Sequence, residues 1–168
     1  GSQRMEMLRI AYADDERVQV NDIELCKSQP SYTVLTLREF KALDPGAHLC
    51  FVLGADWSGG LDDWYQASEL PLLAHLVVLN RPGPGLELAG FKGFSQACHA
   101  NDLRVKPAGL CYAFDGPELD LSSTEVRDAL KRDGKASGEE TNKQSKQWLS
   151  NALPEGVYQY IESNGLYL

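Results

Sequence analysis

The sequence predicts an α/β fold in which parallel strands alternate with helices. Residues 48–53 and 74–79 form two near-continuous apolar runs, and each run ends in a turn rich in Gly, Asp, Asn or Pro. Such runs are typical of strands buried on both faces of a parallel sheet. A helix-like stretch over residues 61–72 separates them, and a third apolar run covers residues 110–114. This alternation predicts βαβ units.

The N-terminal part of the chain is predicted to form two helices with a strand between them. Apolar residues at i, i+3 and i+7 predict an amphipathic helix over residues 3–12. Apolar and polar residues alternate over residues 18–25, which predicts a strand with one face in water. Pro30 cannot continue a strand ladder, and the hydroxyl residues after it can cap a second helix that contains Leu35 and Phe40.

The C-terminal part is predicted to be mainly helical. A helical pattern covers residues 94–103, and another helix is expected from Leu121 to about Lys131. Residues 133–147 are almost wholly polar, which predicts a mobile surface insertion. The last helix is expected to begin near Pro154 and to end before Gly165.

Composition predicts one globular domain that spans residues 1–168. The chain is 43% hydrophobic and 24% charged, which is near the usual composition of soluble domains. No apolar run approaches about 18 residues and no secretory signal is visible, so a cytoplasmic location without membrane contact is expected. The net charge of −8 argues against binding to nucleic acid, because that requires a basic surface.

The cysteine and histidine residues are not spaced like ligands of a metal ion. The cysteines lack a C-x-x-C spacing and two lie in apolar runs, so buried free thiols are expected rather than disulfides or zinc ligands. The histidines stand alone, which favours core or edge positions over catalysis. These residues are Cys26, Cys50, Cys98, Cys111, His48, His75 and His99.

The most informative local motif is Ser-Ser-Thr-Glu-Val-Arg at residues 122–127. Ser122 and Glu125 have the spacing of a capping box, so a helix is expected to begin here. The N–H groups and positive dipole at a helix start favour phosphate binding, and Arg127 lies one turn further, where its guanidinium can bind two phosphate oxygens. The commoner meaning of this pattern is an ordinary capped helix with a surface arginine.

Two other segments have both a functional and a structural interpretation. Gly54 and Asp56 follow a buried strand, where open α/β sheets bind ligands and where a carboxylate can accept a ribose hydroxyl. A glycine-assisted turn with a capping aspartate is an equal alternative. Trp64 and Tyr65 can form an aromatic platform for a flat ring, although a core tryptophan on a helix face is the commoner case.

The order of these motifs resembles that of bacterial nicotinate-nucleotide adenylyltransferases. The resemblance covers the chain from about Gln3 to the C-terminus, with a gap near residues 85–110. The matching stations are Arg4 to Leu8, Pro30 to Thr33, Thr36-Leu37, Gly54 to Asp56, Leu61 to Trp64, Ala74 to Val78, Arg81 to Gly83, Leu121 to Arg127, Leu153 to Glu155 and Tyr160 to Tyr167.

The resemblance implies a Rossmann-like doubly wound parallel sheet of the nucleotidyltransferase type, with the N-terminal strand missing. It implies adenylyl transfer from ATP to nicotinate mononucleotide, giving deamido-NAD and pyrophosphate in NAD biosynthesis. The mononucleotide phosphate attacks the α-phosphorus of ATP directly, so the protein mainly positions two polyanions. Mg²⁺ would be held mainly by the ATP phosphates and water. A homo-oligomer is compatible with the resemblance.

The resemblance also assigns binding residues for both nucleotides. The residues expected to bind ATP are Gly54, Asp56, Arg81, Ser122, Ser123, Thr124 and Arg127. Those expected to bind nicotinate mononucleotide are Thr33, Trp64 and Tyr65, with the pyridine ring stacked on Trp64.

The chain departs from the family pattern at two places. The family has Pro just before the tryptophan that matches Trp64, whereas this chain has Asp62 and Asp63. A carboxylate is unfavourable beside a bound carboxylate, so selectivity for the acid over the amide mononucleotide is expected to weaken. The family's H-x-G-H motif has no counterpart here, so no catalytic residue is expected in this chain, nor turnover by it alone. The alternative is a noncatalytic nucleotide-binding remnant or fragment of that enzyme.

Overall fold

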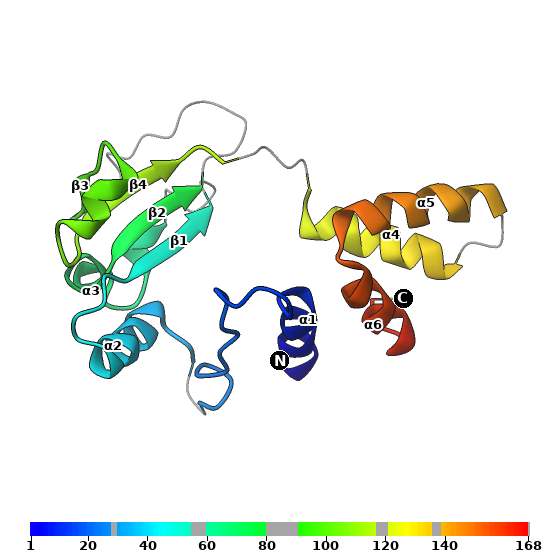
Figure 1. Cartoon of the computed structure of the whole chain (residues 1–168), viewed down its shortest axis with the longest axis horizontal. Coiled ribbons are helices and arrows are strands. Elements are labelled where there is room, and N and C mark those ends of the chain that lie inside the picture. Colours follow the sequence, from blue (N-terminus) through cyan, green and yellow to red (C-terminus); the bar gives the residue numbers. More distant parts are fainter. Residues whose placement is uncertain (28–29, 55–59, 80–90, 117–120, 136–138, 168) are drawn as a thin grey trace. The chain divides into compact units, whose positions relative to one another are not determined.

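The structure is a computed structural model, and its backbone divides into two compact units (Figure 1). One unit is formed by residues 26–118, and the other by residues 1–25 together with 119–168. The ranges that the structure describes are 1–27, 30–54, 60–79, 91–116, 121–135 and 139–167.

Among the described residues of the unit 26–118, four strands form a parallel sheet at its centre (Figure 1). Its strands are β1 (Cys50–Gly54), β2 (His75–Leu79), β3 (Ser95–Gln96) and β4 (Leu110–Phe114), in the order β1-β2-β4-β3. All three pairings are parallel. The strands predicted from the three apolar runs are therefore confirmed, and so is the α/β fold class.

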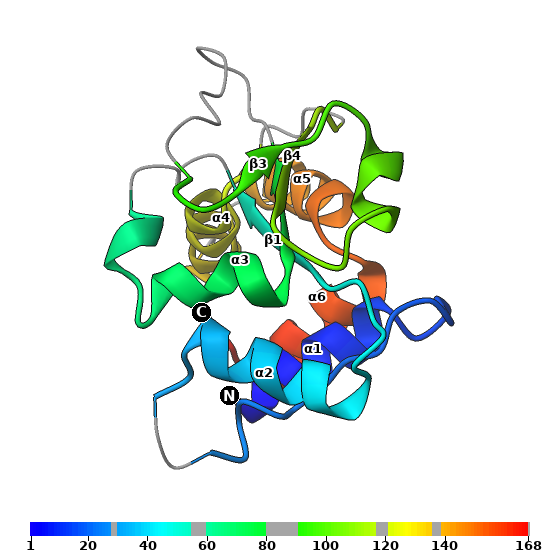
Figure 2. The same cartoon turned by 90° about the vertical axis from the view of Figure 1, so that its left-hand side faces the viewer.

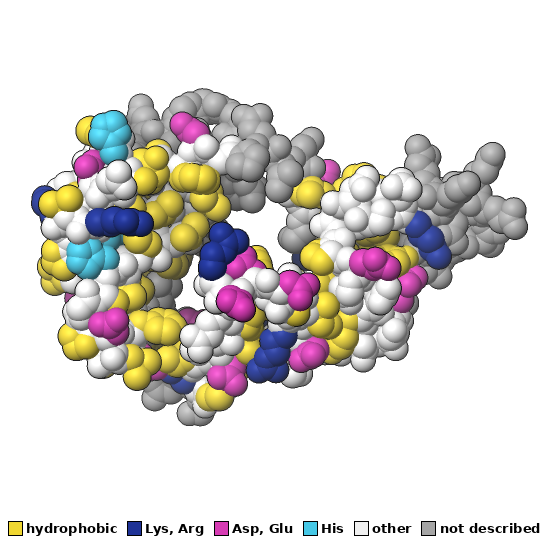
Figure 3. All heavy atoms as spheres, in the orientation of Figure 1, with side chains coloured by type: hydrophobic (Ala, Val, Ile, Leu, Met, Phe, Trp, Pro, Cys, Tyr) yellow, Lys and Arg dark blue, Asp and Glu magenta, His cyan; other side chains and the backbone are white. Residues whose placement is uncertain are grey.

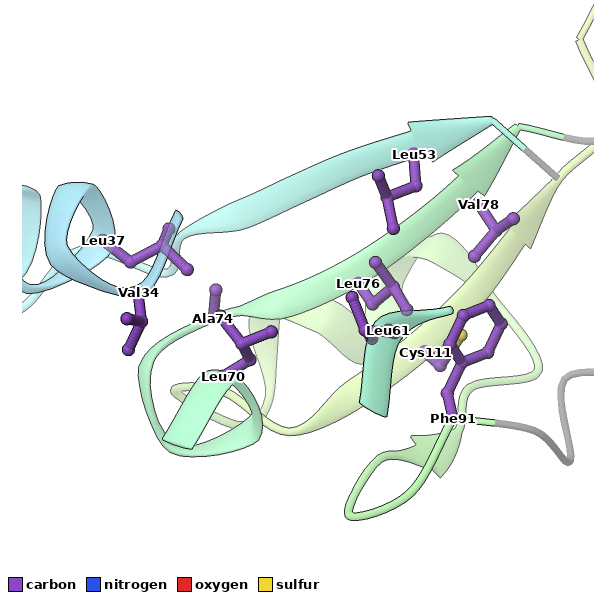
Figure 4. Close-up of a cluster of buried hydrophobic side chains, with 10 residues drawn as sticks. All are labelled: Val34, Leu37, Leu53, Leu61, Leu70, Ala74, Leu76, Val78, Phe91 and Cys111. Atoms are coloured by element: carbon purple, nitrogen blue, oxygen red, sulfur yellow. The ribbon is translucent and has the colours of Figure 1, made fainter. Parts of the chain in front are cut away.

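The main core covers one face of this sheet (Figure 4). Leu53 of β1 lies in register with Val78 of β2, and Leu76 lies in register with Cys111 of β4. All four are buried. Helix α2 (Thr33–Leu43) adds two buried apolar residues to the same cluster. Burial of a large aliphatic side chain contributes about 1.5–3 kcal/mol, so this cluster is the principal support of the unit.

The opposite face of the sheet exposes apolar side chains. Val52 is 52% exposed, Leu79 40% and Phe114 44%. In Figure 3, hydrophobic side chains gather at the surface over β1 and β2. Parallel sheets usually bury both faces, so this degree of exposure is unusual for strands of this composition.

The segment predicted as one helix over residues 61–72 instead forms three short helical turns. They are η2 (Leu61–Asp63), η3 (Ala67–Glu69) and α3 (Leu70–Leu73). Trp64 is extended, with ψ 151°, and the backbone of Gln66 is left-handed, with φ 52°. A continuous helix cannot pass through either conformation. Helix α3 packs against α2 (Figure 2).

The helical pattern over residues 94–103 begins too early. Strand β3 comes first, and the short helix η5 (Ala100–Arg104) follows it. A capping box between His99 and Asp102 marks where this helix begins. The Asp102 carboxylate accepts hydrogen bonds from the N–H groups of Cys98 and His99, at 3.1 and 2.9 Å.

The described residues of the other unit form four helices. They are α1 (Ser2–Ala11), α4 (Ser123–Lys135), α5 (Glu139–Ala152) and α6 (Glu155–Ser163). Their buried cluster is made mainly by α4, α5 and α6, and partly buried residues of α1 pack against it. Pro154 is the N-cap of α6, and Gly165 follows its end with φ +60°, so the predicted bounds of the last helix are confirmed. The buried residues of the cluster are Ala129, Leu130, Leu149, Val157 and Ile161.

The predicted strand over residues 18–25 is wrong, whereas the mobility of residues 133–147 stays a prediction. Residues 18–25 form turns rather than a strand, because Asn21 accepts the N–H of Ile23 at 2.8 Å and the Leu25 N–H bonds to the Asp22 carbonyl. Within residues 133–147, the described backbone is helical at the end of α4 and the start of α5. This segment is rich in Glu, Lys and Gln, which favour helices despite their polarity.

The cysteines are free, as predicted, but only Cys111 is buried. Burial raises the pKa of the Cys111 thiol to about 11. The prediction of buried thiols is wrong for Cys26, Cys50 and Cys98, which are exposed.

His75 is fully buried, as expected of a core histidine. Over the described part of the chain, no helix is long and apolar enough to cross a membrane.

Candidate functional site

A pocket of about 390 Å³ lies beside the start of α2, within the unit 26–118. Thr33, Trp64 and Tyr65 all line it, so the three residues predicted to bind one ligand are close together. The pocket also contains residues that sequence reasoning did not single out as ligand contacts. These are Ser31, Tyr32, Val34, Asp63 and Leu70.

Local backbone conformation directs these side chains to the pocket. Tyr32 is the N-cap of α2, and its backbone is extended, with φ −103° and ψ 131°. The helical conformation therefore begins only at the next residue, Thr33. No side chain forms a capping hydrogen bond here, so the predicted hydroxyl cap is wrong. Thr33 is the first residue of α2, and Val34 behind it is buried in the core. The buried Val34 anchors the helix start at the pocket wall.

The position of Trp64 is compatible with a role in the core and with a role in the pocket. Its indole meets the ring of Phe51 edge-on, with ring centroids 5.8 Å apart, and packs against the main core. The same residue lines the pocket and is half-buried. A tryptophan held by the core on one side can present a fixed face to a flat ring on the other.

Two tyrosines form a second aromatic surface of the pocket. The rings of Tyr32 and Tyr65 are stacked, with centroids 4.4 Å apart and an interplanar angle of 28°. Tyr32 belongs to the Pro-Ser-Tyr-Thr motif, so its position in that motif was the available signal for it. The pocket is suited to a flat ligand with hydrogen-bonding groups at its edge.

The charged residues near the pocket are of both signs. Asp63 lines the pocket, while the neighbouring Asp62 forms an ion pair with Lys92 at 2.6 Å. The hydrogen bond to Asp62 raises the pKa of Lys92, and the charges of Asp62 and Asp63 raise it further. Lys92 is therefore fully charged at neutral pH.

The strand-end part of the predicted ATP site is only partly described. Gly54 is the last residue of β1, at the carboxyl edge of the sheet where α/β proteins bind ligands. Asp56 and Arg81 lie outside the described residues. Their assignment to ATP stays a prediction.

The predicted phosphate motif begins α4, in the other unit. The Ser122 hydroxyl accepts the N–H of Glu125 at 3.1 Å, and the Glu125 carboxylate accepts the N–H of Ser122 at 2.9 Å. The predicted capping box is thus confirmed. Hydrogen bonds to the Glu125 carboxylate from the side chain and from the backbone N–H of Ser122 lower the pKa of Glu125. The N–H groups of Ser123 and Thr124 take no part in the two hydrogen bonds of the capping box.

Arg127 lies close to this helix start. Its guanidinium donates a hydrogen bond to the Thr124 hydroxyl at 3.2 Å, and its side chain is exposed. A cation and two N–H groups at a helix start can hold an anion. Both the phosphate site and the simple capped helix remain compatible with this geometry. Among the described residues, no three His, Cys, Asp or Glu side chains are grouped to hold a metal ion.

The all-parallel sheet places the chain in the class of α/β proteins, and a family model narrows that class. Residues 1–129 match the family described as cytidylyltransferase-like. Relatives named probable nicotinate-nucleotide adenylyltransferase are similar over nearly the whole chain. The protein of Marinomonas sp. is 33% identical over 98% of this chain and 71% of its own length. That of Marinobacter nauticus is 34% identical over 99% and 73%. The chain therefore belongs to the cytidylyltransferase-like family and, within it, to the nicotinate-nucleotide adenylyltransferases.

Two solved structures share the fold. One is Plasmodium falciparum nicotinic acid mononucleotide adenylyltransferase complexed with NaAD, with a TM-score of 0.67 and 19% identity over 99% of this chain and 74% of that one. The same protein complexed with APC has a TM-score of 0.68 and 18% identity over 99% and 75%. The predicted nucleotidyltransferase type of fold is confirmed.

Proposed function

We propose that this protein transfers the adenylyl group of ATP to nicotinate mononucleotide, giving deamido-NAD and pyrophosphate. The observation that carries the proposal is the pocket that brings together Thr33, Trp64 and Tyr65. The resemblance to the family implies that these three residues bind the same ligand. The names of the Marinomonas and Marinobacter relatives and the NaAD bound to the Plasmodium protein support the same substrates.

In the proposed reaction, a phosphate oxygen of the mononucleotide attacks the α-phosphorus of ATP. One P–O bond forms, the bond to the β-phosphate bridging oxygen breaks, and pyrophosphate leaves with that electron pair. The phosphate is already largely ionised near neutral pH, so the attack needs little help from a general base. The task of the protein is to hold two polyanions in line and to stabilise charge on the transferred group.

Each part of the described structure has a proposed role in that task. Trp64 stacks on the pyridine ring, while Thr33 and Tyr65 contact its substituent. The helix start at Ser123 and Thr124, together with Arg127, binds ATP phosphates, because N–H dipoles and a guanidinium both stabilise phosphoryl oxygens.

Mg²⁺ is expected to accompany ATP. The described side chains do not form an oxygen cage for this ion, so no step is assigned to a metal held by the protein. Mg²⁺ generally prefers phosphate and water ligands, so we propose that it enters with ATP.

The test is to incubate the protein with ATP and nicotinate mononucleotide and to measure dinucleotide and pyrophosphate. Equal amounts of both products are expected from a version of the protein that carries the family's H-x-G-H motif, and no useful turnover is expected from the 168-residue chain alone, in which that motif has no counterpart. If the version with the motif binds both nucleotides and forms no product, the transfer reaction is contradicted, and a noncatalytic nucleotide-binding protein is favoured instead.

A further inference from the structure

The two aspartates beside Trp64 have different surroundings. Asp62 points its carboxylate to Lys92, with 2.6 Å between the charged atoms, and so has a direct counter-charge. Asp63 contributes to the wall of the pocket itself. Because one lysine stands beside two carboxylates, the group Asp62, Asp63 and Lys92 keeps one net negative charge next to the pocket.

The rest of the described pocket wall offers no positive side chain. Among the lining residues that the structure describes, none is Lys, Arg or His. The polar side-chain groups among the lining residues include the hydroxyls of serine, threonine and tyrosine, and the Asp63 carboxylate. Hydroxyls donate to an acid and to an amide alike, so they discriminate weakly between them.

We infer that Asp63 determines which ligand charge this pocket prefers. With Asp63 in its wall, the pocket discriminates against the acid mononucleotide, relative to the amide, more than it would with a neutral residue at this position. This inference rests on the proposed function. An ionised Asp63 accepts a hydrogen bond from the N–H group of a carboxamide, whereas it repels a ring carboxylate. The acid form therefore loses affinity in this pocket and the amide form does not.

The substitution Asp63→Asn removes the charge and keeps the size of the side chain. We expect the ratio of acid to amide affinity to rise about threefold or more, the range for charges several ångströms apart near a protein surface. The change comes mainly from tighter binding of the acid. Added salt reduces the difference between wild type and variant, because the interaction is between partly exposed charges.

Asp44→Asn is the matched control. Asp44 follows the last residue of α2, whereas the pocket lies at the first. An eleven-residue helix places these ends about 15 Å apart. That distance exceeds the Debye length at physiological salt, so the same loss of charge at Asp44 should leave the ratio unchanged.

The measurement is isothermal titration of the full chain with nicotinate mononucleotide and with nicotinamide mononucleotide. A rise in the acid-to-amide ratio for Asp63→Asn, but not for Asp44→Asn, supports the inference. Asp63→Ser should shift the ratio in the same direction. An unchanged ratio in both Asp63 variants overturns the role of Asp63 and leaves the proposed function standing. If neither mononucleotide binds to the wild type, the proposed acceptor site fails as well.

Discussion

Tyr32 and Tyr65 stack with their ring centroids 4.4 Å apart, although they come from different elements. Tyr32 precedes α2, and Tyr65 follows the extended residue that ends η2. The contact therefore ties the start of the helix to the irregular segment that carries Trp64. Both rings remain partly exposed, at 40% and 48%, and one surface of the pocket depends on this pair.

Loss of one ring should weaken the fold of this unit by a small and measurable amount. Aromatic pairs contribute about 0.5–1.5 kcal/mol beyond the area they bury, so Tyr32→Ala should lower the free energy of unfolding by about that much. Tyr32→Phe keeps the stack and should behave like the wild type. Urea unfolding of the three proteins makes the comparison, and equal losses for Ala and Phe would show that the hydroxyl, not the stack, matters.

Stability should fall in mild acid because of His75. The ring is fully buried, Nε2 donates to the Lys106 carbonyl at 2.9 Å, and Nδ1 accepts the Leu110 N–H at 3.2 Å. Burial, with smaller effects from the positive charges of His48 and Lys41, lowers the pKa of His75 below its ordinary value of 6.5. A proton on Nδ1 would place two donors against each other.

The lowered pKa of His75 makes the stability of the protein depend on pH. The unfolded chain takes up the proton as pH falls below about 6.5, and the folded chain resists it, so the contribution of His75 is complete above that pH and is lost below it. The free energy of unfolding should fall by at most about 1.4 kcal/mol for each pH unit. Melting curves between pH 7 and 5 measure this, and His75→Gln should flatten the dependence. An equally steep fall in the variant would assign the effect to other groups.

Arg127→Ala should weaken ATP binding much more than mononucleotide binding. Hydrogen bonds to charged groups are worth about 1.5–3 kcal/mol, which corresponds to tenfold or more in affinity. Arg132 of the same helix is the control, since its Nε bonds to the Asp128 carbonyl rather than lying at the helix start. Equal losses for both nucleotides, or equal effects of Arg127→Ala and Arg132→Ala on ATP, would remove Arg127 from the phosphate site.

The sequence predicted the sheet well because the strands of a parallel sheet are short apolar runs, which are visible in the sequence alone. Cys50–Gly54, His75–Leu79 and Leu110–Phe114 are short apolar runs bounded by turns. The same reasoning failed for residues 18–25. Apolar and polar residues alternate there, but no neighbouring strand pairs with the described residues of this segment, and the Asn21 side chain stabilises a turn instead. The polar composition of residues 133–147 did not indicate the helix at the start of α5, because intrinsic helix propensity does not depend on apolar residues.

The residues of the candidate site could be named from the sequence, but the local backbone conformation that shapes the pocket could not. Thr33, Trp64 and Tyr65 were identified through their motifs, and the structure brings them to one pocket. The stacking of Tyr32 on Tyr65 depends on the left-handed turn at Gln66 and on the extended Trp64, which the helix-like pattern concealed.

The central claim is that the pocket beside α2 binds the pyridine ring on Trp64. Isothermal titration of the wild type and of Trp64→Ala with nicotinate mononucleotide tests it most directly, with circular dichroism to verify that the variant is folded. Stacking of a base on an aromatic side chain is worth about 1–3 kcal/mol, so the variant should bind the mononucleotide at least about fivefold more weakly. Its ATP affinity should stay the same. Unchanged mononucleotide affinity in a folded Trp64→Ala protein would contradict the account and make Trp64 a core residue only.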